Sequence, residues 1–181
     1  MSHPQAVLDF WFDEGNQAFW FAKDGGFDAR IRQQFYSVWQ QAVYSELDGW
    51  RETLRGRLAE IIVLDQFSRN LWRDSALAFA QDNMAVALAQ EAVRQAGFAD
   101  MQPAERHFML MPLMHSESRK IHEAAERLFA RYTTPPYALD FELKHKVIID
   151  RFGRYPHRNE VLGRESTAEE AAFLLEPGSS F

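Results

Sequence analysis

The stretch from Leu58 to Arg73, reading LAEIIVLDQFSRNLWR, limits the fold of this chain more than any other segment. Its apolar side chains recur at intervals of three or four residues and cover most of the circumference of a helix, which indicates a central, buried helix. Asp65 and Arg69 lie four residues apart within it, so they can pair across one helical turn. Because an unpaired buried charge is strongly destabilising, we expect both to find partners.

Two interpretations of these polar residues stay open. The first is a structural ion pair between Asp65 and Arg69 that fixes the register of the helix. The second is a polar pocket, to which Gln66, Arg69 and Asn70 would contribute.

Length and composition exclude several classes of protein. The chain has 181 residues, no cysteine and a net charge of −6. This length suits a single domain over residues 1–181 that buries enough surface to fold without disulfides. The lack of cysteine, of a leader sequence and of a long apolar run fits a cytoplasmic protein with no membrane partner. The acidic balance argues against a nucleic-acid partner.

Helical spacing recurs along the whole chain, and no window alternates as a half-buried strand would. The pattern predicts helices over 4–12, 27–47, 51–70, 75–96, a segment that opens at Pro103, 117–132, 139–152 and 168–175. Their lengths and short connections favour an all-α fold of antiparallel helix pairs, with about seven main helices plus short terminal ones. No convincing self-match at the tetratricopeptide period of about 34 residues occurs, so any repeat of that type is degenerate.

Local signals mark several helix boundaries. Gly97 and Gly153 are placed as C-terminal stops, and Pro112 should end or kink the fifth helix. Ser116 or Ser118 can cap the sixth helix, 133–136 reads as a linker, and Thr167 to Glu170 forms a capping box for the last helix.

Two further polar clusters accompany the one around Asp65. One contains His115, Ser116 and Glu117, at a break between two predicted helices. The other spans 151–159, where three arginines, a histidine and an asparagine are interleaved with aromatic residues. Between residues 141 and 164, six Lys or Arg face three Asp or Glu. Such a positive patch suits a small anion, because arginine binds carboxylate and phosphate bidentately. Alternatively, these arginines satisfy helix C-terminal carbonyls and pair with acids.

Histidine chemistry is the second functional signal. His115 and His157 are candidates for general acid or base, because histidine titrates near neutrality and arginines beside it could stabilise an anion. No HxxxH or HExxH spacing supports a metal site, no nucleophile elbow supports a serine triad, and no cofactor motif is present. We expect His122 and Glu126, one turn apart, to face solvent.

The clusters DQFSRN, MPLMHSES and FGRYPHRNEVLGR occur between an opening VLDFWF and a closing STAEEAAFL. In this order they resemble the bacterial family catalogued as domain of unknown function 924 (DUF924), from about Val7 to Leu175. The resemblance implies a tetratricopeptide-like, all-α superhelical fold and leaves the biochemical role open. The chain departs from the family pattern at Ser68, Tyr155 and His122, where proline, phenylalanine and glutamine are common. The family motif residues correspond here to Asp65, Gln66, Arg69, Asn70, His115, Ser116, Glu117, Gly153, Arg154, Pro156, His157, Arg158 and Asn159.

The leading hypothesis is a polar pocket that binds a small anionic molecule, with proton transfer by His115 or His157. The candidate ligand-binding residues are Asp65, Gln66, Arg69, Asn70, Glu117, Arg154, Arg158 and Asn159. The alternative is a helix-pair module that binds a protein partner through exposed aromatic anchors such as Trp50 or Trp72, its polar clusters being structural. The sequence leaves open whether the protein is an enzyme.

Overall fold

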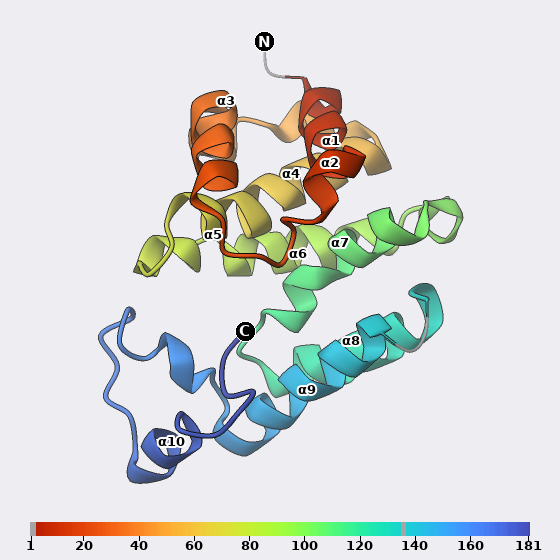
Figure 1. The fold of residues 1–181 in the computed structure, drawn as a ribbon. Coiled ribbons are helices and arrows are strands. Elements are labelled where there is room, and N and C mark those ends of the chain that lie inside the picture. The colour runs from red at the N-terminus through yellow and green to blue at the C-terminus, as the bar shows by residue number, and fades with distance from the viewer. Residues whose placement is uncertain (1–2, 135–136) are drawn as a thin grey trace.

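The computed structural model describes residues 3–134 and 137–181, and within these ranges the chain is helical with no strand, which confirms the predicted all-α class. Figure 1 shows two groups of helices, one above the other. The upper group contains α1 (Pro4–Phe12), α2 (Glu14–Gln17), α3 (Gly25–Val43), α4 (Leu54–Ile62), α5 (Ser68–Leu71), α6 (Asp82–Ala92) and α7 (Pro103–Met114). The lower group contains α8 (Arg119–Tyr132), α9 (Tyr137–Phe152) and α10 (Ala168–Phe173). In the described part, seven α-helices have at least nine residues, in line with the predicted number of main helices.

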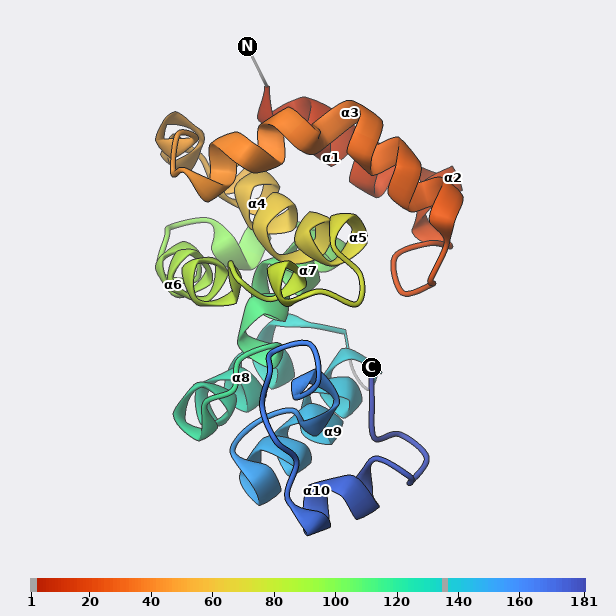
Figure 2. The same cartoon turned by 90° about the vertical axis from the view of Figure 1, so that its left-hand side faces the viewer.

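The predicted central helix is central and buried. It runs from α4 through a π-helical turn, η2 (Val63–Phe67), into α5, and every residue from 58 to 68 is buried. Helices α1, α6 and α7 pack against α4, and α3 packs against η2 and α5 (Figure 2). A π-turn has i→i+5 hydrogen bonds, so it is wider than an α-helix, and such turns are frequent at functional sites. Here it contains Asp65 and Gln66.

The start of α4 depends on a close backbone approach. A Cβ on Gly56 would lie 1.9 Å from the carbonyl oxygen of Trp50, so only glycine fits there. Thr53 caps the helix by accepting a hydrogen bond from the Gly56 N–H at 3.0 Å. A 3-10 turn, η1 (Asp48–Glu52), therefore replaces the first residues of the helix predicted from residue 51.

Two other predicted helices have different limits. The helix predicted over 27–47 begins at Gly25, because Asp24 caps it through the Phe27 N–H, and ends at Val43. The helix predicted over 75–96 is divided into η3 (Ala76–Ala78) and α6, with Asp82 in the first turn of α6. Helix α6 ends at Ala92, so Gly97 (φ +87°) introduces η4 (Phe98–Asp100) instead of stopping the helix itself.

The remaining boundary signals are mostly confirmed. Ser118 caps α8, Gly153 (φ +73°) follows the end of α9, and Thr167 and Glu170 form the capping box of α10. Helix α7 continues past Pro112 to Met114, so this proline does not end it. Of the predicted linker 133–136, Thr133 and Thr134 are non-helical, and Pro135 and Pro136 lie outside the described residues.

Aromatic side chains fill the core between α1, α3, the central helix and α7. Trp11, Phe27, Phe67 and Phe108 are almost completely buried, and Trp11 contacts the other three rings at centroid distances of 5.3–6.0 Å. Helix α8 packs beside both α7 and α9 (Figures 1 and 2), which gives the predicted helix pairs. In the described part of the chain, no helix has the length and apolar character needed to cross a membrane.

Candidate functional site

The π-turn places Asp65 against His115, the residue that caps the C-terminus of α7. The Oδ1 atom of Asp65 lies 2.6 Å from Nδ1 of His115. Gln66 donates to the other carboxylate oxygen at 2.5 Å, and Nη1 of Arg69 lies 3.1 Å from Oδ1. The ion pair predicted between Asp65 and Arg69 is therefore confirmed. His115 contacts the same carboxylate oxygen of Asp65 as Arg69 does.

Burial and neighbouring charges set the protonation states of Asp65 and His115. Burial opposes the charged form of Asp65, but His115 and Arg69 lower the pKa of its carboxyl below the ordinary value. Burial, followed by repulsion from Arg69, lowers the pKa of His115 below 6.5, although Asp65 acts in the opposite direction. At neutral pH the imidazole is thus neutral, and its Nδ1–H donates to the Asp65 carboxylate. The Nε2 atom makes no hydrogen bond to a described residue and is left with a lone pair.

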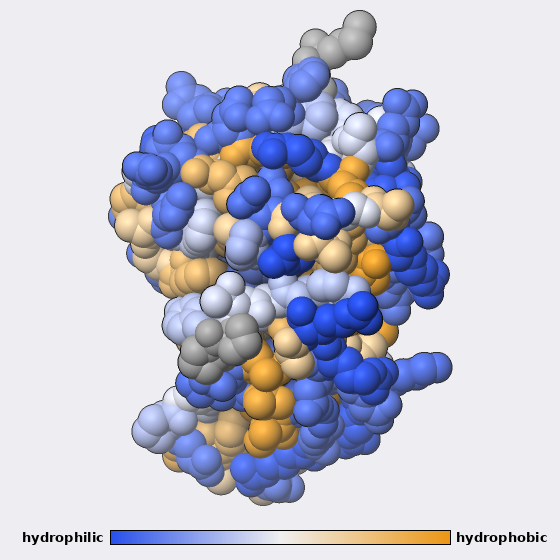
Figure 3. Space-filling view, turned by 90° about the vertical axis from the view of Figure 1, so that its right-hand side faces the viewer, coloured by the Kyte–Doolittle hydropathy of each residue, from blue (hydrophilic) through white to orange (hydrophobic). Residues whose placement is uncertain are grey.

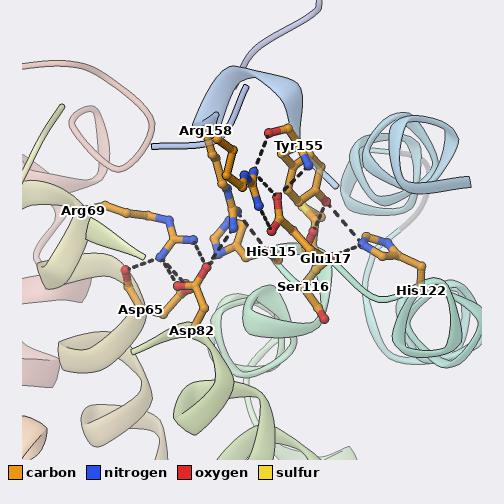
Figure 4. A network of polar contacts seen from close by, with 11 residues as sticks. Asp65, Arg69, Asp82, His115, Ser116, Glu117, His122, Tyr155 and Arg158 are labelled. Carbon is orange, nitrogen blue, oxygen red and sulfur yellow. Dashed lines mark hydrogen bonds and ion pairs between the residues drawn. The ribbon is translucent and has the colours of Figure 1, made fainter. Parts of the chain in front are cut away.

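Asp82, at the start of α6, joins two of the predicted arginines (Figure 4). Its two oxygens accept from Nη1 and Nη2 of Arg69 at 2.9 and 3.0 Å, and one also accepts from Nη1 of Arg158 at 3.1 Å. Arg158, from η5 (Pro156–Arg158), also donates to the backbone oxygen of His115 at 3.0 Å. Asp82 was not among the predicted site residues. Its one sequence signal is an acidic residue inside a helix pattern of small side chains.

The guanidinium of Arg158 is almost completely enclosed. It lies 4.4 Å from the ring centroid of Phe79 and 4.6 Å from that of Tyr155, and its side chain is only 7% exposed. Its Nε atom is buried without a hydrogen-bond partner among the described residues, as is Nδ1 of His157. Burial lowers the pKa of Arg158 from 12.5, although Asp82 opposes this change. An anion in contact with this group would therefore be favourable.

These residues surround a cavity of about 610 Å³ between the two groups of helices. The charged side chains in its wall are Lys23, Arg69, Arg73, Arg158 and one carboxylate, Asp74. The carboxylates that pair with the arginines, Asp28, Asp65 and Asp82, do not line it. The rest of the wall is largely aromatic or imidazole, from Trp20, Phe21, Phe79, Tyr137, Phe141, Tyr155, Phe181, His107, His115, His145 and His157.

The other three histidines of the wall are also neutral at physiological pH. Burial lowers the pKa of His107 to about 4, that of His157 to about 4 and that of His145 to about 3. His107 and His145 were not predicted as site residues, because each stands on an ordinary helical face in the sequence. In the part of the chain that is described, no group of three or more His, Asp or Glu side chains is arranged to hold a metal ion.

The structure brings together most of the predicted site residues. Gln66, Arg69, Asn70, His115, His157 and Arg158 line the cavity, and Asp65 lies directly behind His115. Asn70 donates to Asp28 at 2.8 Å, and Asp28 also holds Arg73.

Besides Asp65, three predicted residues do not line the cavity. Glu117 accepts from the backbone N–H of Tyr155 at 2.7 Å and pairs with Arg164. Arg154 donates to both oxygens of Glu170 at 2.6 and 2.7 Å. Asn159 donates to Ser166 at 3.0 Å. These contacts hold residues 154–170 in place, and that segment supplies His157 and Arg158 to the cavity.

The prediction that His122 faces solvent is wrong. The residue is fully buried, with Nδ1 2.7 Å from Glu142 and Nε2 2.8 Å from the backbone oxygen of Ser116 (Figure 4). It occupies the same face of α8 as Ala125 and Phe129, both buried, so helical spacing carries it inward. Glu142, also buried, supplies the polar partner that such a position requires.

Comparison with known proteins gives a family and a fold. The family described as "bacterial protein of unknown function (DUF924)" matches residues 7–178. A solved structure of a protein of unknown function from Agrobacterium tumefaciens is similar to this chain, with 34% sequence identity and a TM-score of 0.89. The similarity covers 95% of this chain and 96% of that one. Among curated proteins, nothing matches.

Proposed function

Because this chain belongs to the DUF924 family of bacterial proteins of unknown function, we propose its function from the cavity alone. The cavity binds a small anionic molecule, and His115 exchanges a proton with that molecule. The volume of about 610 Å³ is within the ordinary range of small-molecule sites.

The unequal distribution of charge around the cavity carries this proposal. Three guanidiniums, of Arg69, Arg73 and Arg158, line the cavity, whereas the acids that orient them do not line it. Lys23 and Asp74 pair with each other at the exposed edge of the cavity, so their charges cancel. A guanidinium fixed in this way keeps its charge and loses little conformational freedom when it meets a carboxylate or phosphate. The buried, unpartnered Nε–H of Arg158 is a donor that an anion could satisfy.

The chemistry that fits this wall is proton transfer. The described residues that line the cavity include no serine, threonine or cysteine, so the hydroxyl or thiol nucleophiles of these residues do not face it. The hydroxyl of Tyr155 already donates to the backbone oxygen of Met114 at 2.5 Å. His115 combines a neutral ring, an Asp65 partner on Nδ1 and an unbonded Nε2, which is the arrangement of a general base.

Binding of anions by charge-conserving variants tests the proposal. We expect acetate and inorganic phosphate to raise the melting temperature of the wild-type protein. Arg158→Lys keeps the positive charge but removes the Nε–H donor, so it should weaken binding by about tenfold, the loss of one charge-assisted hydrogen bond. Calorimetric titration measures the affinity.

Arg151→Ala is the matched control, because it removes a positive charge of the same sequence cluster that does not line the cavity. Its ion pair with Glu169 is exposed, so neither folding nor anion affinity should change much. Equal affinities in wild type, Arg158→Lys and Arg151→Ala would contradict the proposal.

The alternative, a protein-binding module, has less support. Trp50 and Trp72 are partly buried and pack against the core, so they are not exposed anchors. On the face shown in Figure 3, apolar side chains form separate patches among hydrophilic ones rather than one continuous surface. The cavity therefore remains the better supported candidate.

A further inference from the structure

One wall of the cavity is already covered by an aromatic ring. Phe181 stacks on His145 of α9 with ring centroids 3.7 Å apart and an angle of 20° between the planes. His145 is held in place for this contact, because its Nδ1 lies 2.7 Å from the backbone oxygen of Phe141 and Tyr155 packs edge-on against the ring. All three side chains, Phe181, His145 and Tyr155, line the cavity.

The covering ring is weakly attached. Phe181 is 52% exposed, which is unusual for a phenylalanine in a close stacking contact. Figure 2 shows the segment after α10 turning back toward α9. Among the described residues, no backbone–backbone hydrogen bond is made beyond the one donated by Glu176, and Ser179 ties the segment to Leu174 through its side chain at 3.2 Å. The ring can therefore leave without disturbing a helix.

We infer that the face of His145 covered by Phe181 is a subsite for a planar aromatic ring, which Phe181 occupies in the structure and a ligand displaces. This inference rests on the proposed function and narrows its ligand to an aromatic molecule with an anionic group. Phe141 and Tyr137 extend the aromatic wall beside His145, with 4.9 Å between their ring centroids, while Arg69 and Arg158 supply the cationic part of the same cavity.

Competition between the ring of Phe181 and a ligand has a measurable effect. When a ligand must displace a resident group, its apparent Kd equals its intrinsic Kd divided by the fraction of molecules in which the subsite is free. One stacked aromatic contact corresponds to about a fivefold change in affinity, or about 1 kcal/mol at about 1.4 kcal/mol per tenfold. Removing the ring should strengthen aromatic binding by that factor.

The experiment compares wild type, Phe181→Ala and a control by calorimetric titration. Leu175→Ala is the control, because this side chain is 88% exposed, belongs to the same segment and does not line the cavity. The probes are benzyl alcohol, benzoate, cyclohexanecarboxylate and acetate. Phe181→Ala should bind benzyl alcohol and benzoate about fivefold more tightly than wild type, with acetate within twofold. Leu175→Ala should match wild type throughout.

The outcomes separate this inference from the proposed function. Unchanged benzoate and benzyl alcohol affinities in Phe181→Ala would overturn the subsite, as would an equal gain for the saturated ring of cyclohexanecarboxylate. If benzyl alcohol gains fivefold but acetate and phosphate binding is insensitive to Arg158→Lys, the subsite stands and the anion proposal fails. If the anions bind through Arg158 but Phe181→Ala changes nothing, the anion proposal stands alone.

Discussion

At the scale of single residues, the site depends on carboxylates that each contact several side chains at once. Asp65 is in contact with His115, Gln66 and Arg69 at once, and Asp82 binds two guanidiniums. Such shared contacts stabilise buried charges that would be unfavourable as isolated pairs. Burial and the charge of Arg69 leave His115 neutral, and its Nε2 makes no hydrogen bond to a described residue.

This arrangement predicts that anion binding is coupled to proton uptake. An anion beside Arg69 and Arg158 offsets the repulsion that, after burial, lowers the pKa of His115, so its pKa should rise on binding. At a pH near 6, wild type should take up a fraction of a proton, and at most about one, with each acetate bound. Titration in two cationic buffers of different ionisation enthalpy measures this number.

His115→Gln should abolish most of this uptake while acetate still binds. His157→Gln is the comparison, because burial holds the pKa of His157 at about 4, so it contributes less near pH 6. Undiminished uptake in His115→Gln would place the proton-transfer group elsewhere.

At the scale of elements, the segment between α9 and α10 carries Arg158 of the site, and the ion pair of Arg154 with Glu170 is one of the contacts that hold this segment. Arg154 donates to both oxygens of Glu170, whose side chain is 3% exposed, and to the backbone oxygen of Glu165. Arg151 pairs with the neighbouring Glu169, but those side chains are 43% and 63% exposed. The two ion pairs therefore differ in burial rather than in chemistry.

Arg154→Ala should destabilise the protein more than Arg151→Ala does, because it leaves the Glu170 carboxylate without its cationic partner at a side chain that is only 3% exposed. Arg151→Ala should change the free energy of unfolding by less than about 1 kcal/mol. Urea unfolding of both variants measures these values. Anion affinity in the folded Arg154→Ala protein should stay within about twofold of wild type, since Arg154 does not line the cavity. A large loss of affinity with unchanged stability would reverse the role given to Arg154.

The sequence predicted the elements better than their breaks. Helical spacing located the buried central helix, and the capping box located α10, because both signals are local. The π-turn was not predictable, since apolar residues at helical spacing continue on either side of Asp65. The break before Asp82 was missed for a related reason, because its carboxylate is satisfied by arginines 13 and 76 residues away in sequence.

The site was predicted in part. The family motifs pointed to Arg69, His115 and Arg158, which line the cavity, and to Arg154, which does not. Motif membership does not distinguish a residue that faces a cavity from one that holds a loop, because both need fixed charged partners. His107, His145 and Phe181 reach the cavity only through the packing of α7, α9 and the segment after α10 against one another.

At the scale of the whole molecule, the four histidines of the cavity share one property. Burial lowers the pKa of each, to about 4 for His107 and His157, to about 3 for His145, and below 6.5 for His115. In the unfolded chain a histidine binds its proton near pH 6.5. At a pH between the folded-state and unfolded-state pKa values of a histidine, the unfolded state holds more protons than the folded state. The free energy of unfolding therefore falls as the pH decreases through this range. Above about pH 6.5 the stability contribution of these groups is fully present.

We therefore expect the free energy of unfolding to be flat from pH 8 to 7 and to fall steeply between pH 6 and 4. A histidine contributes at most about 1.4 kcal/mol per pH unit, and only between its folded and unfolded pKa values, so the slope is steepest where several of them titrate together. Glu142 opposes this in part, because burial raises its pKa and the folded state then gains a proton.

Urea unfolding at half-unit pH intervals measures the slope. His107 is half-buried. His107→Asn should reduce the slope by the equivalent of about one proton, because the variant has no imidazole at this position to take up a proton on unfolding. A flat profile down to pH 4.5 would mean that the cavity admits enough water to keep these imidazoles solvated, and the low-dielectric site proposed here would be wrong.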